Sequence, residues 1–263
     1  MDQKIRKLLA GECGNYIFPF FWQHGETEEV LREYMKVIAE SSIGAVCVES
    51  RPHPDFVGEK WWQDMDVILD EARKRNMKVW ILDDSHFPTG YANGVLKNAD
   101  GKLRRQSLTV RSLDCLKSGT EMEFSLESYQ KAAPWELNQM EQHMLQGQEW
   151  KLFDDDQLIS VTAVREGGKT EADILDLSGQ IPSGKIVFPV PEGKWQLKFC
   201  ILTRNRGPHR DYINMMDEES CRVLIDTVYE PHYQHYAADF GTTIAGFFSD
   251  EPEIGNGHLY EMG

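Results

Sequence analysis

The chain has 263 residues, of which 41% are hydrophobic and 11% aromatic, and it carries a formal net charge of −15 at pH 7. This composition is typical of a globular protein with a substantial core, and the length suits one large domain or two small ones. Because so acidic a chain repels phosphate backbones and anionic lipid, nucleic acid and membrane surfaces are excluded as expected partners, whereas an uncharged sugar is compatible with it.

The five cysteines, at positions 13, 47, 115, 200 and 221, are odd in number and lack the spacing of a metal site. They predict reduced and mostly buried thiols. The first ten residues lack the apolar core of a signal peptide, and no apolar run reaches the length of a membrane span. We therefore expect a cytoplasmic protein.

The first hundred residues predict alternating strands and helices. Strands are expected at 16–22, 44–48 and 77–82, and the continuous apolar run "YIFPFFW" predicts a first strand covered on both faces. The helix after it begins where Thr27 can act as a cap, and a second helix with one apolar face precedes the third strand. This order implies a parallel sheet with right-handed crossovers.

From about residue 102 to residue 206, apolar residues alternate with polar ones, which is typical of antiparallel strands. The segments 186–188 and 195–199 are predicted to pair as a hairpin across the turn at 191–193. A polar stretch at about 134–145 resembles a helix. We interpret residues 102–206 as an inserted β-sandwich-like subdomain after the third strand.

The α/β pattern returns after the insert, with a helical face that Pro231 is expected to kink or divide and a fourth strand at 243–248. A (β/α)8 barrel takes about 250 residues, so the residues outside the insert suffice for about four of its β-α units. We expect an α/β fold that is the first half of a TIM-type barrel. Residues 1–101 would hold the first three units, 102–206 the insert, and 207–263 the unit leading to the fourth strand.

Polar and aromatic residues follow each predicted strand, on the side where parallel α/β folds bind ligands. The predicted substrate-binding residues are Trp22, His24, Glu49, Arg51, His53, Asp83, Asp84, His86 and Glu253. Carboxylates suit acid–base catalysis at a glycosidic bond, Arg and His bind hydroxyls, and an aromatic ring suits a sugar face. A structural role is the alternative interpretation of the acidic residues, because Asp83 and Asp84 can form turns and the acids after the fourth strand can cap a helix.

The predicted catalytic carboxylates are Glu251 and Asp250. Burial of Glu251 beside other acids would favour the protonated carboxyl that a general acid needs, and Asp250, with Asp83 or Asp84, would shape its field or bind hydroxyls. Pro252 is expected to restrict Glu251 to extended backbone geometry. No two of His24, His53 and His86 lie at a helical metal-ligand spacing such as i, i+4, so no metal site is assigned.

Three stretches together resemble the large bacterial glycosyl hydrolases related to glycoside hydrolase family 106, the α-L-rhamnosidase type. They are 18–52, beginning "FPFFWQHG", 61–94, ending "DDSHFPTGYANG", and 211–253, ending "GFFSDEPE". The chain departs from the family pattern at Gln23, where Asn is usual, and at Phe87, where Trp is frequent, which bears on the substrate more than on the reaction. The resemblance implies the N-terminal part of the catalytic region of a glycosidase acting on an oligosaccharide or glycoside. It also suggests an inverting enzyme that uses calcium, although no cofactor is evident from the residues.

Two hypotheses follow. The first is a glycoside hydrolase whose present portion is inactive alone, because the second carboxylate would lie beyond residue 263, and which tends to self-associate through the edges of its first and fourth strands. The second is a non-catalytic carbohydrate-binding protein on a partial barrel. A sugar isomerase or epimerase would need a clustered metal site that the sequence does not show.

Overall fold

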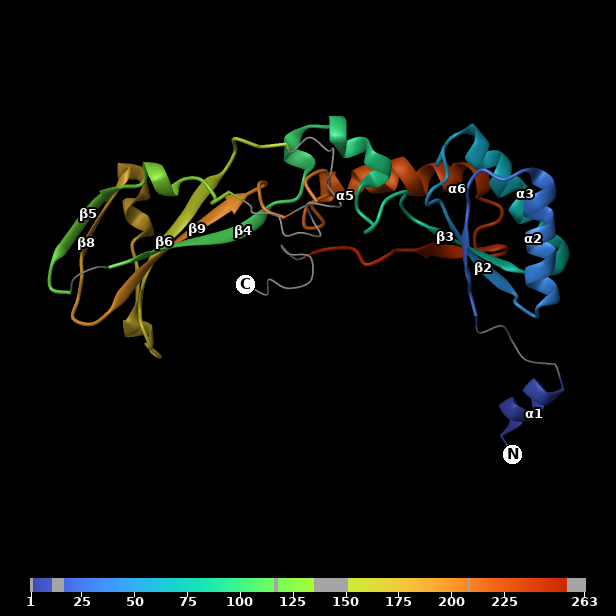
Figure 1. The fold of residues 1–263 in the computed structure, drawn as a ribbon, viewed down its shortest axis with the longest axis horizontal. Coiled ribbons are helices and arrows are strands. Elements are labelled where there is room, and N and C mark those ends of the chain that lie inside the picture. Colours follow the sequence, from blue (N-terminus) through green and yellow to red (C-terminus); the bar gives the residue numbers. More distant parts are fainter. Residues whose placement is uncertain (1, 11–16, 116–117, 135–150, 208, 255–263) are drawn as a thin grey trace. The chain divides into compact units, whose positions relative to one another are not determined.

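The computed structural model describes residues 2–10, 17–115, 118–134, 151–207 and 209–254. The chain forms two compact units. Residues 1–103 with 215–253 form the first, called the α/β unit, and residues 104–214 with 254–263 form the second, called the β unit. Figure 1 shows the helices and the parallel strands in the first unit and the antiparallel strands in the second.

The α/β unit is built on a four-stranded parallel sheet in the order β1-β2-β3-β10. The strands are β1 (Phe20–Trp22), β2 (Ala45–Glu49), β3 (Lys78–Leu82) and β10 (Ile244–Phe248). The predicted parallel α/β arrangement is therefore confirmed. The spatial order follows the chain order, so β1 and β10 are the edges of this sheet, as expected.

Helices α1 (Gln3–Leu9), α2 (Glu28–Glu40) and α3 (Glu59–Arg75) belong to the same unit. Their apolar positions follow the helical period, and α3 buries Trp61, Met65, Ile68, Leu69 and Ala72. Thr27 occupies the N-cap position of α2, but its side chain makes no capping hydrogen bond. The cap geometry is thus present without the predicted side-chain contribution.

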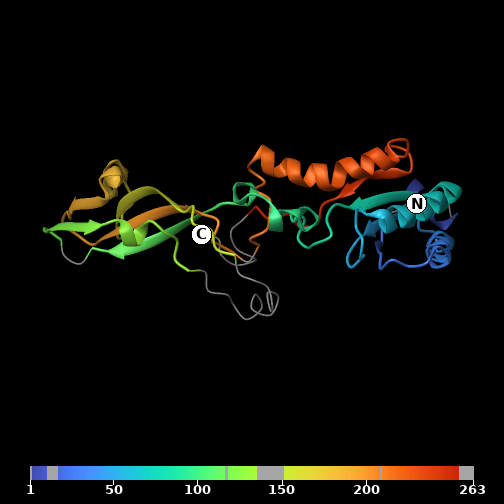
Figure 2. The same ribbon diagram turned by 90° about the horizontal axis from the view of Figure 1, so that it is seen from above.

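The last helical segment is drawn as one continuous helix in Figure 2, and its hydrogen-bonding period changes just before Pro231. It consists of α5 (Glu218–Leu224), a π-helical turn (Ile225–Tyr229) and α6 (Glu230–Tyr236), with Pro231 in the first turn of α6. Proline lacks the N–H that an α-helix needs, and its ring clashes with the carbonyl four residues earlier. The wider π turn relieves this clash, so the predicted kink or division takes the form of a π-bulge.

Helices pack on one face of the sheet, and several aromatic side chains on the opposite face are accessible to solvent among the described residues. Phe21 and Phe247 occupy the same row of the sheet, and their rings pack on Tyr34 of α2 and on Tyr229 of the π turn. The alternate residues of β1 point the other way, and Phe20 is 51% and Trp22 56% exposed. The prediction that the first strand is covered on both faces is therefore wrong in the part of the chain that the structure describes.

Four exposed aromatic residues and one partly buried one, Trp80, form a surface that we call the open aromatic face. Its members are Phe18, Phe20, Trp22, Trp80 and Phe248. Ring centroids of Phe18 and Trp80 lie 6.2 Å apart, and those of Phe20 and Phe248 lie 5.4 Å apart. The face thus spans three strands of the sheet, including both edges.

The β unit has two antiparallel sheets. One has the order β4-β9-β6-β7, and the other pairs β5 with β8. The strands are β4 (Ser107–Asp114), β5 (Glu121–Ser125), β6 (Gln157–Arg165), β7 (Ile174–Asp176), β8 (Lys185–Pro189) and β9 (Trp195–Thr203). Short 3-10 turns of this unit lie at Glu127–Tyr129, Glu171–Asp173 and Ser178–Ser183. Those at Ala92–Asn98 and Gly101–Leu103 belong to the α/β unit. The prediction of antiparallel strands from the alternation of apolar and polar residues in 102–206 is therefore confirmed.

The predicted hairpin between 186–188 and 195–199 is wrong. Strand β8 pairs with β5, whereas β9 lies between β4 and β6. Phe188 of β8 and Phe199 of β9 instead bury their rings in one shared core, together with Trp195. The two segments therefore face each other across the core of the unit, which two-residue periodicity alone does not distinguish from pairing edge to edge.

Other expectations concern helices and thiols. The helix-like stretch at 134–145 lies, from residue 135 onward, outside the described residues. No helix in the described parts of the chain is long and apolar enough to cross a lipid bilayer. The four described cysteines are free thiols, of which Cys47 is buried and Cys115, Cys200 and Cys221 are partly buried, and Cys13 lies outside the described residues.

Candidate functional site

The carboxyl ends of the parallel strands lie at one edge of the sheet. Trp22 pairs with Glu49, and Phe248 pairs with Leu82, at the last positions of their strands. The backbone pairing continues beyond the strands, because the N–H of Gln23 donates to Glu49 O and that of Asp83 donates to Phe248 O. The residues that follow the strands are therefore brought to the same edge, where a parallel fold places its ligand site.

Arg51 is the centre of a charged cluster at this edge. Its Nε donates to Glu49 Oε1 over 2.6 Å, and its Nη2 donates to Asp250 Oδ2 over 2.7 Å. The guanidinium also lies 5.5 Å from the ring centroid of Phe87. The Glu49 side chain is only 6% exposed, so its charge depends on this partner. Burial opposes the charge of Arg51, but its hydrogen bonds to Asp250 and Glu49 outweigh this effect and raise its pKa.

Asp83 is fully buried at the end of β3. It accepts hydrogen bonds from Thr89 Oγ1 over 2.6 Å and from the Tyr229 hydroxyl over 2.5 Å. Burial raises the pKa of Asp83 in spite of these hydrogen bonds. Burial also raises the pKa of Tyr229, and the hydrogen bond to Asp83 raises it further. Asp83 therefore ties the sheet edge to the last helical segment.

Asp84 organises the loop that follows β3. Its carboxylate is fully buried and accepts hydrogen bonds from the backbone N–H groups of Ser85, Gly90, Ala92 and Asn93, over 2.8 to 3.0 Å. These contacts occupy both oxygens of the carboxylate. The geometry therefore corresponds to the turn-forming role considered for Asp84 and leaves it little capacity for a substrate hydroxyl.

His53 belongs to a buried network and not to an open surface. Its side chain is fully buried, with Nε2 3.1 Å from Asp64 Oδ2, and its Nδ1 accepts from the N–H of Asp55 over 3.0 Å. Lys60 pairs with the same Asp64 carboxylate. Since both ring nitrogens already form hydrogen bonds, His53 contributes to the wall of a pocket and has no ring nitrogen left to bind a ligand.

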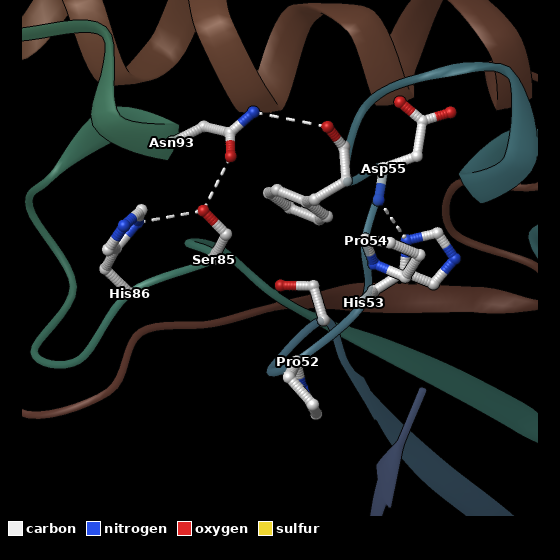
Figure 3. Close-up of a pocket in the computed structure, with 9 residues that line it drawn as sticks. Pro52, His53, Pro54, Asp55, Ser85, His86 and Asn93 are labelled. Carbon is white, nitrogen blue, oxygen red and sulfur yellow. Dashed lines mark hydrogen bonds between the residues drawn. The ribbon is translucent and has the colours of Figure 1, made fainter. Parts of the chain in front are cut away.

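That pocket lies at the carboxyl ends of β2 and β3 and has a volume of about 430 Å³ (Figure 3). It is lined by Ser50, Pro52, His53, Pro54, Asp55, Phe56, Ser85, His86 and Asn93. The sequence reasoning identified His53 and His86 but missed Ser85 and Asn93. The sequence feature that could have pointed to Ser85 and Asn93 is the loop "SHFPTGYANG", whose closely spaced Gly, Pro and Asn residues indicate a tightly turned segment.

Two predicted residues after β1 are more exposed. Trp22 presents more than half of its surface to solvent, and His24 forms a 2.7 Å contact from Nδ1 to Glu26 Oε1. Between them, Gln23 is fully buried, and its Oε1 has no hydrogen-bond partner among the described residues. Gln23 is the position at which the chain departs from the family's usual Asn, and it was not among the predicted site residues.

Glu251 differs from the geometry expected of it. Its φ is +44°, in the left-handed region, so the prediction of extended backbone before Pro252 is wrong. Glu251 is also exposed, and the burial that was expected to favour its protonated form is not seen in the described part of the chain. Glu253 is half-buried, and no helix begins within 251–254, so these acids cap no helix there.

The arrangement thus gathers Glu49, Arg51 and Asp250 in one ion-pair cluster, with Asp83 and Asp84 at the end of the neighbouring strand. Among the described residues, no group of three or more His, Cys, Asp or Glu side chains is arranged to hold a metal ion. We therefore assign no residue to the calcium ion that the family resemblance suggests.

No protein-family model and no curated protein matches the chain. Among solved structures, the chain is similar to the rhamnosidase from Novosphingobium sp. PP1Y, with 8% sequence identity and a TM-score of 0.47. The similarity covers 89% of this chain and 38% of that one, so the chain spans well under half the length of its structural neighbour. Neither an activity nor a residue role is transferred from so distant a likeness.

Proposed function

We propose that the chain is part of a glycoside hydrolase that cleaves an α-L-rhamnoside or a related glycoside with a pair of carboxylic acids. The observation that carries this proposal is the ion-pair cluster, in which Arg51 joins Glu49 of β2 to Asp250 after β10. Carboxylates from two different strands meet at the carboxyl edge of a parallel sheet, where α/β enzymes draw their catalytic groups from several strand ends.

Each residue in the proposal has a chemical role. Arg51 holds the two carboxylates in place, so that they can accept hydrogen bonds from sugar hydroxyls. The exposed ring of Trp22 suits the apolar face of a sugar. Glu251, next to Asp250 at the carboxyl edge of the sheet, is the proposed general acid.

The proposed fold is the first half of a (β/α)8 barrel with the β unit inserted after its third strand. Parallel sheets are normally covered on both faces. In the α/β unit the helices pack on one face only, and the open aromatic face on the other side has the position that barrel strands turn toward the barrel interior. Further strands pairing with the edges β1 and β10 would close such a barrel and cover this face.

The test is turnover of a panel of aryl glycosides, including an aryl α-L-rhamnoside, by the full-length protein. Glu251→Gln should lower kcat about a hundredfold or more on a substrate with a poor leaving group, because a general acid contributes at least that much. Glu40→Gln, an exposed acid at the end of α2, is the matched control and should leave kcat unchanged. Near-normal turnover by Glu251→Gln would exclude Glu251 as the acid.

A second candidate is a carbohydrate-binding protein without hydrolytic activity. It is favoured by the engagement of both Glu49 and Asp250 with Arg51, since carboxylates held in ion pairs are better placed to bind hydroxyls than to transfer protons. Saturable binding of a glycoside without any turnover over the whole panel would select this candidate.

A further inference from the structure

The pocket at the ends of β2 and β3 contains a chain of hydrogen bonds that ends at His86 (Figure 3). Asn93 Nδ2 donates to the backbone carbonyl of Phe56 over 3.2 Å. Because a carbonyl oxygen can only accept, this contact fixes which end of the Asn93 amide is the donor. Asn93 Oδ1 therefore faces Ser85, whose hydroxyl donates to it over 2.6 Å.

This chain determines the tautomer of His86. The Ser85 hydroxyl has a single proton, and Asn93 receives it. His86 Nδ1 lies 3.0 Å from the same Ser85 oxygen, so Nδ1 must be the donor in this contact. In the neutral imidazole the proton is then on Nδ1, and Nε2 keeps a lone pair that accepts hydrogen bonds. Since the Ser85 proton points to Asn93, Ser85 and His86 do not form the pair of a nucleophile and its base.

The backbone that presents Asn93 is held in a rare conformation. Ala92 and Asn93 have φ values of +49° and +53°, a region that residues other than glycine seldom adopt. The buried carboxylate of Asp84 accepts the N–H groups of both residues and so maintains this geometry. Strained backbone of this kind persists where the surrounding structure over-determines it, and it is concentrated at functional sites.

The ring of His86 is also packed in place. Its centroid lies 5.3 Å from that of Tyr91. A Cβ added to Gly94, whose φ is +77°, would lie 3.5 Å from His86 Cε1, so the backbone of Gly94 approaches the edge of the ring. Both the orientation and the tautomer of His86 are therefore fixed by the loop 84–94.

The lining of the pocket indicates the class of ligand. Pro52, Pro54 and Phe56 supply apolar surface, and the pocket volume lies within the range of small-molecule sites, about 300–1,000 Å³. The hydrogen-bonding capacity left on Ser50, Ser85 and His86 is mainly that of acceptors. Its described lining includes no Lys or Arg, so an anionic ligand would find no counter-charge there.

We propose that this pocket binds the uncharged ring of a sugar or similar polyol, with His86 Nε2 accepting a hydrogen bond from a ligand hydroxyl. Ser85 and Asn93 are positioning residues that hold His86 in the Nδ1–H tautomer. The choice of a sugar among polyols rests on the proposed function, whereas the tautomer rests on the hydrogen bonds of the pocket alone.

The first experiment measures the tautomer without any ligand. Long-range ¹H–¹⁵N NMR spectra of the full chain should show His86 protonated on Nδ1, with the signal assigned by its loss in His86→Gln. Ser85→Ala should shift His86 toward the Nε2–H form that is preferred by a free imidazole, and Ser85→Thr should restore the Nδ1–H form. An Nε2–H signal in the wild-type protein would overturn the positioning role of Ser85 and Asn93.

The second experiment measures binding by titration calorimetry, with methyl α-L-rhamnopyranoside and inositol as probes and inorganic phosphate as the anionic comparison. His86→Ala should weaken sugar binding about tenfold, the effect of losing one good hydrogen bond to the ligand. Ser85→Ala should weaken it less, and Ser85→Thr should bind as the wild type does. His235→Ala and Ser41→Ala, outside the pocket, are the matched controls. Preferential binding of phosphate, or sugar binding unchanged in His86→Ala, would overturn the proposal.

Failure of this proposal differs from failure of the proposed glycosidase. If a sugar binds through His86 but is never cleaved, the glycosidase is contradicted and the pocket assignment is supported. If the full-length protein cleaves glycosides with a KM that His86→Ala leaves unchanged, the pocket assignment is overturned and the glycosidase stands.

Discussion

The guanidinium of Arg51 binds the carboxylate of Asp250 over 2.7 Å, although the two residues are 199 positions apart in the sequence. The same guanidinium binds Glu49, two residues away, over 2.6 Å. The three side chains are largely buried, so each carboxylate depends on the single cation for its charge. The edge of the sheet is therefore stabilised by one arginine that links β2 to the segment after β10.

Arg51→Met is expected to lower the free energy of unfolding of the α/β unit by about 3 kcal/mol, because it leaves the buried Glu49 carboxylate without its partner. Urea unfolding followed by far-ultraviolet circular dichroism measures this, since helices α2, α3, α5 and α6 all lie in that unit. Lys36→Met, which removes an exposed ion pair with Glu33, should cost less than about 1 kcal/mol. Equal losses in the two variants would contradict a buried role for Arg51.

A second prediction concerns His232, which lies fully buried next to α3. Its Nε2 accepts from Trp61 Nε1 over 2.9 Å, and its Nδ1 donates to the carbonyl of Val228 over 2.6 Å. Burial lowers the pKa of His232 from its ordinary value of 6.5 to about 4. Between these two values the unfolded chain binds a proton that the folded protein does not bind. The free energy of unfolding should therefore fall as the pH falls from about 6.5 to about 4, by up to about 3 kcal/mol.

Urea unfolding at a series of pH values checks this expectation. His232→Gln should be less stable at neutral pH but should lose the part of the pH dependence that His232 contributes. His235→Gln, which changes an exposed histidine on the same helix, should keep the wild-type slope. A slope that is unaltered in His232→Gln would show that His232 is not neutral in the folded protein.

A third prediction concerns the loop held by Asp84. Asp84→Ala removes the acceptor of four backbone N–H groups, two of them buried and two part-buried, and should lower the free energy of unfolding by at least about 3 kcal/mol. Asp100→Ala is the comparison, because Asp100 is exposed and accepts from the N–H of Lys102, so its loss should cost about 1 kcal/mol or less. Differential hydrogen exchange of Ala92 and Asn93 provides a local readout, and unchanged protection of both amides would refute the role of Asp84.

A fourth prediction concerns the core of the β unit. The ring of Phe199 is fully buried and stacks on Tyr129 with centroids 4.2 Å apart. Phe199→Ala should cost about 3–5 kcal/mol through lost burial and the cavity that remains. Leu108→Ala, on the exposed side of β4, should cost about 0.5 kcal/mol. The fluorescence of Trp195, which lies in the same core, reports the unfolding, and similar midpoints for both variants would contradict the shared core of β8 and β9.

Local patterns in the sequence were sufficient for the parallel strands, for helices α2 and α3 and for the class of each sheet. The apolar run of β2 reflects burial of all five of its residues, and the alternation in β9 reflects deeper burial on one side, because side-chain direction repeats every two residues along a strand. The position of polar residues after these strands followed from the same reasoning, since parallel strands share one carboxyl edge. These features depend on residues that are near one another in the chain.

Tertiary contacts decided the rest, since they join residues whose separation carries no periodic signal. Strand β9 pairs with β4 and β6 and not with its neighbour β8, and Arg51 finds Asp250 only because β10 lies at the edge of the parallel sheet. Asp83 and Asp84 are adjacent in sequence, yet one binds hydroxyls of Thr89 and Tyr229 while the other binds backbone N–H groups of its own loop. A carboxylate's role depends on which donors surround it, and the sequence specifies the carboxylate while the packing of distant segments supplies the donors.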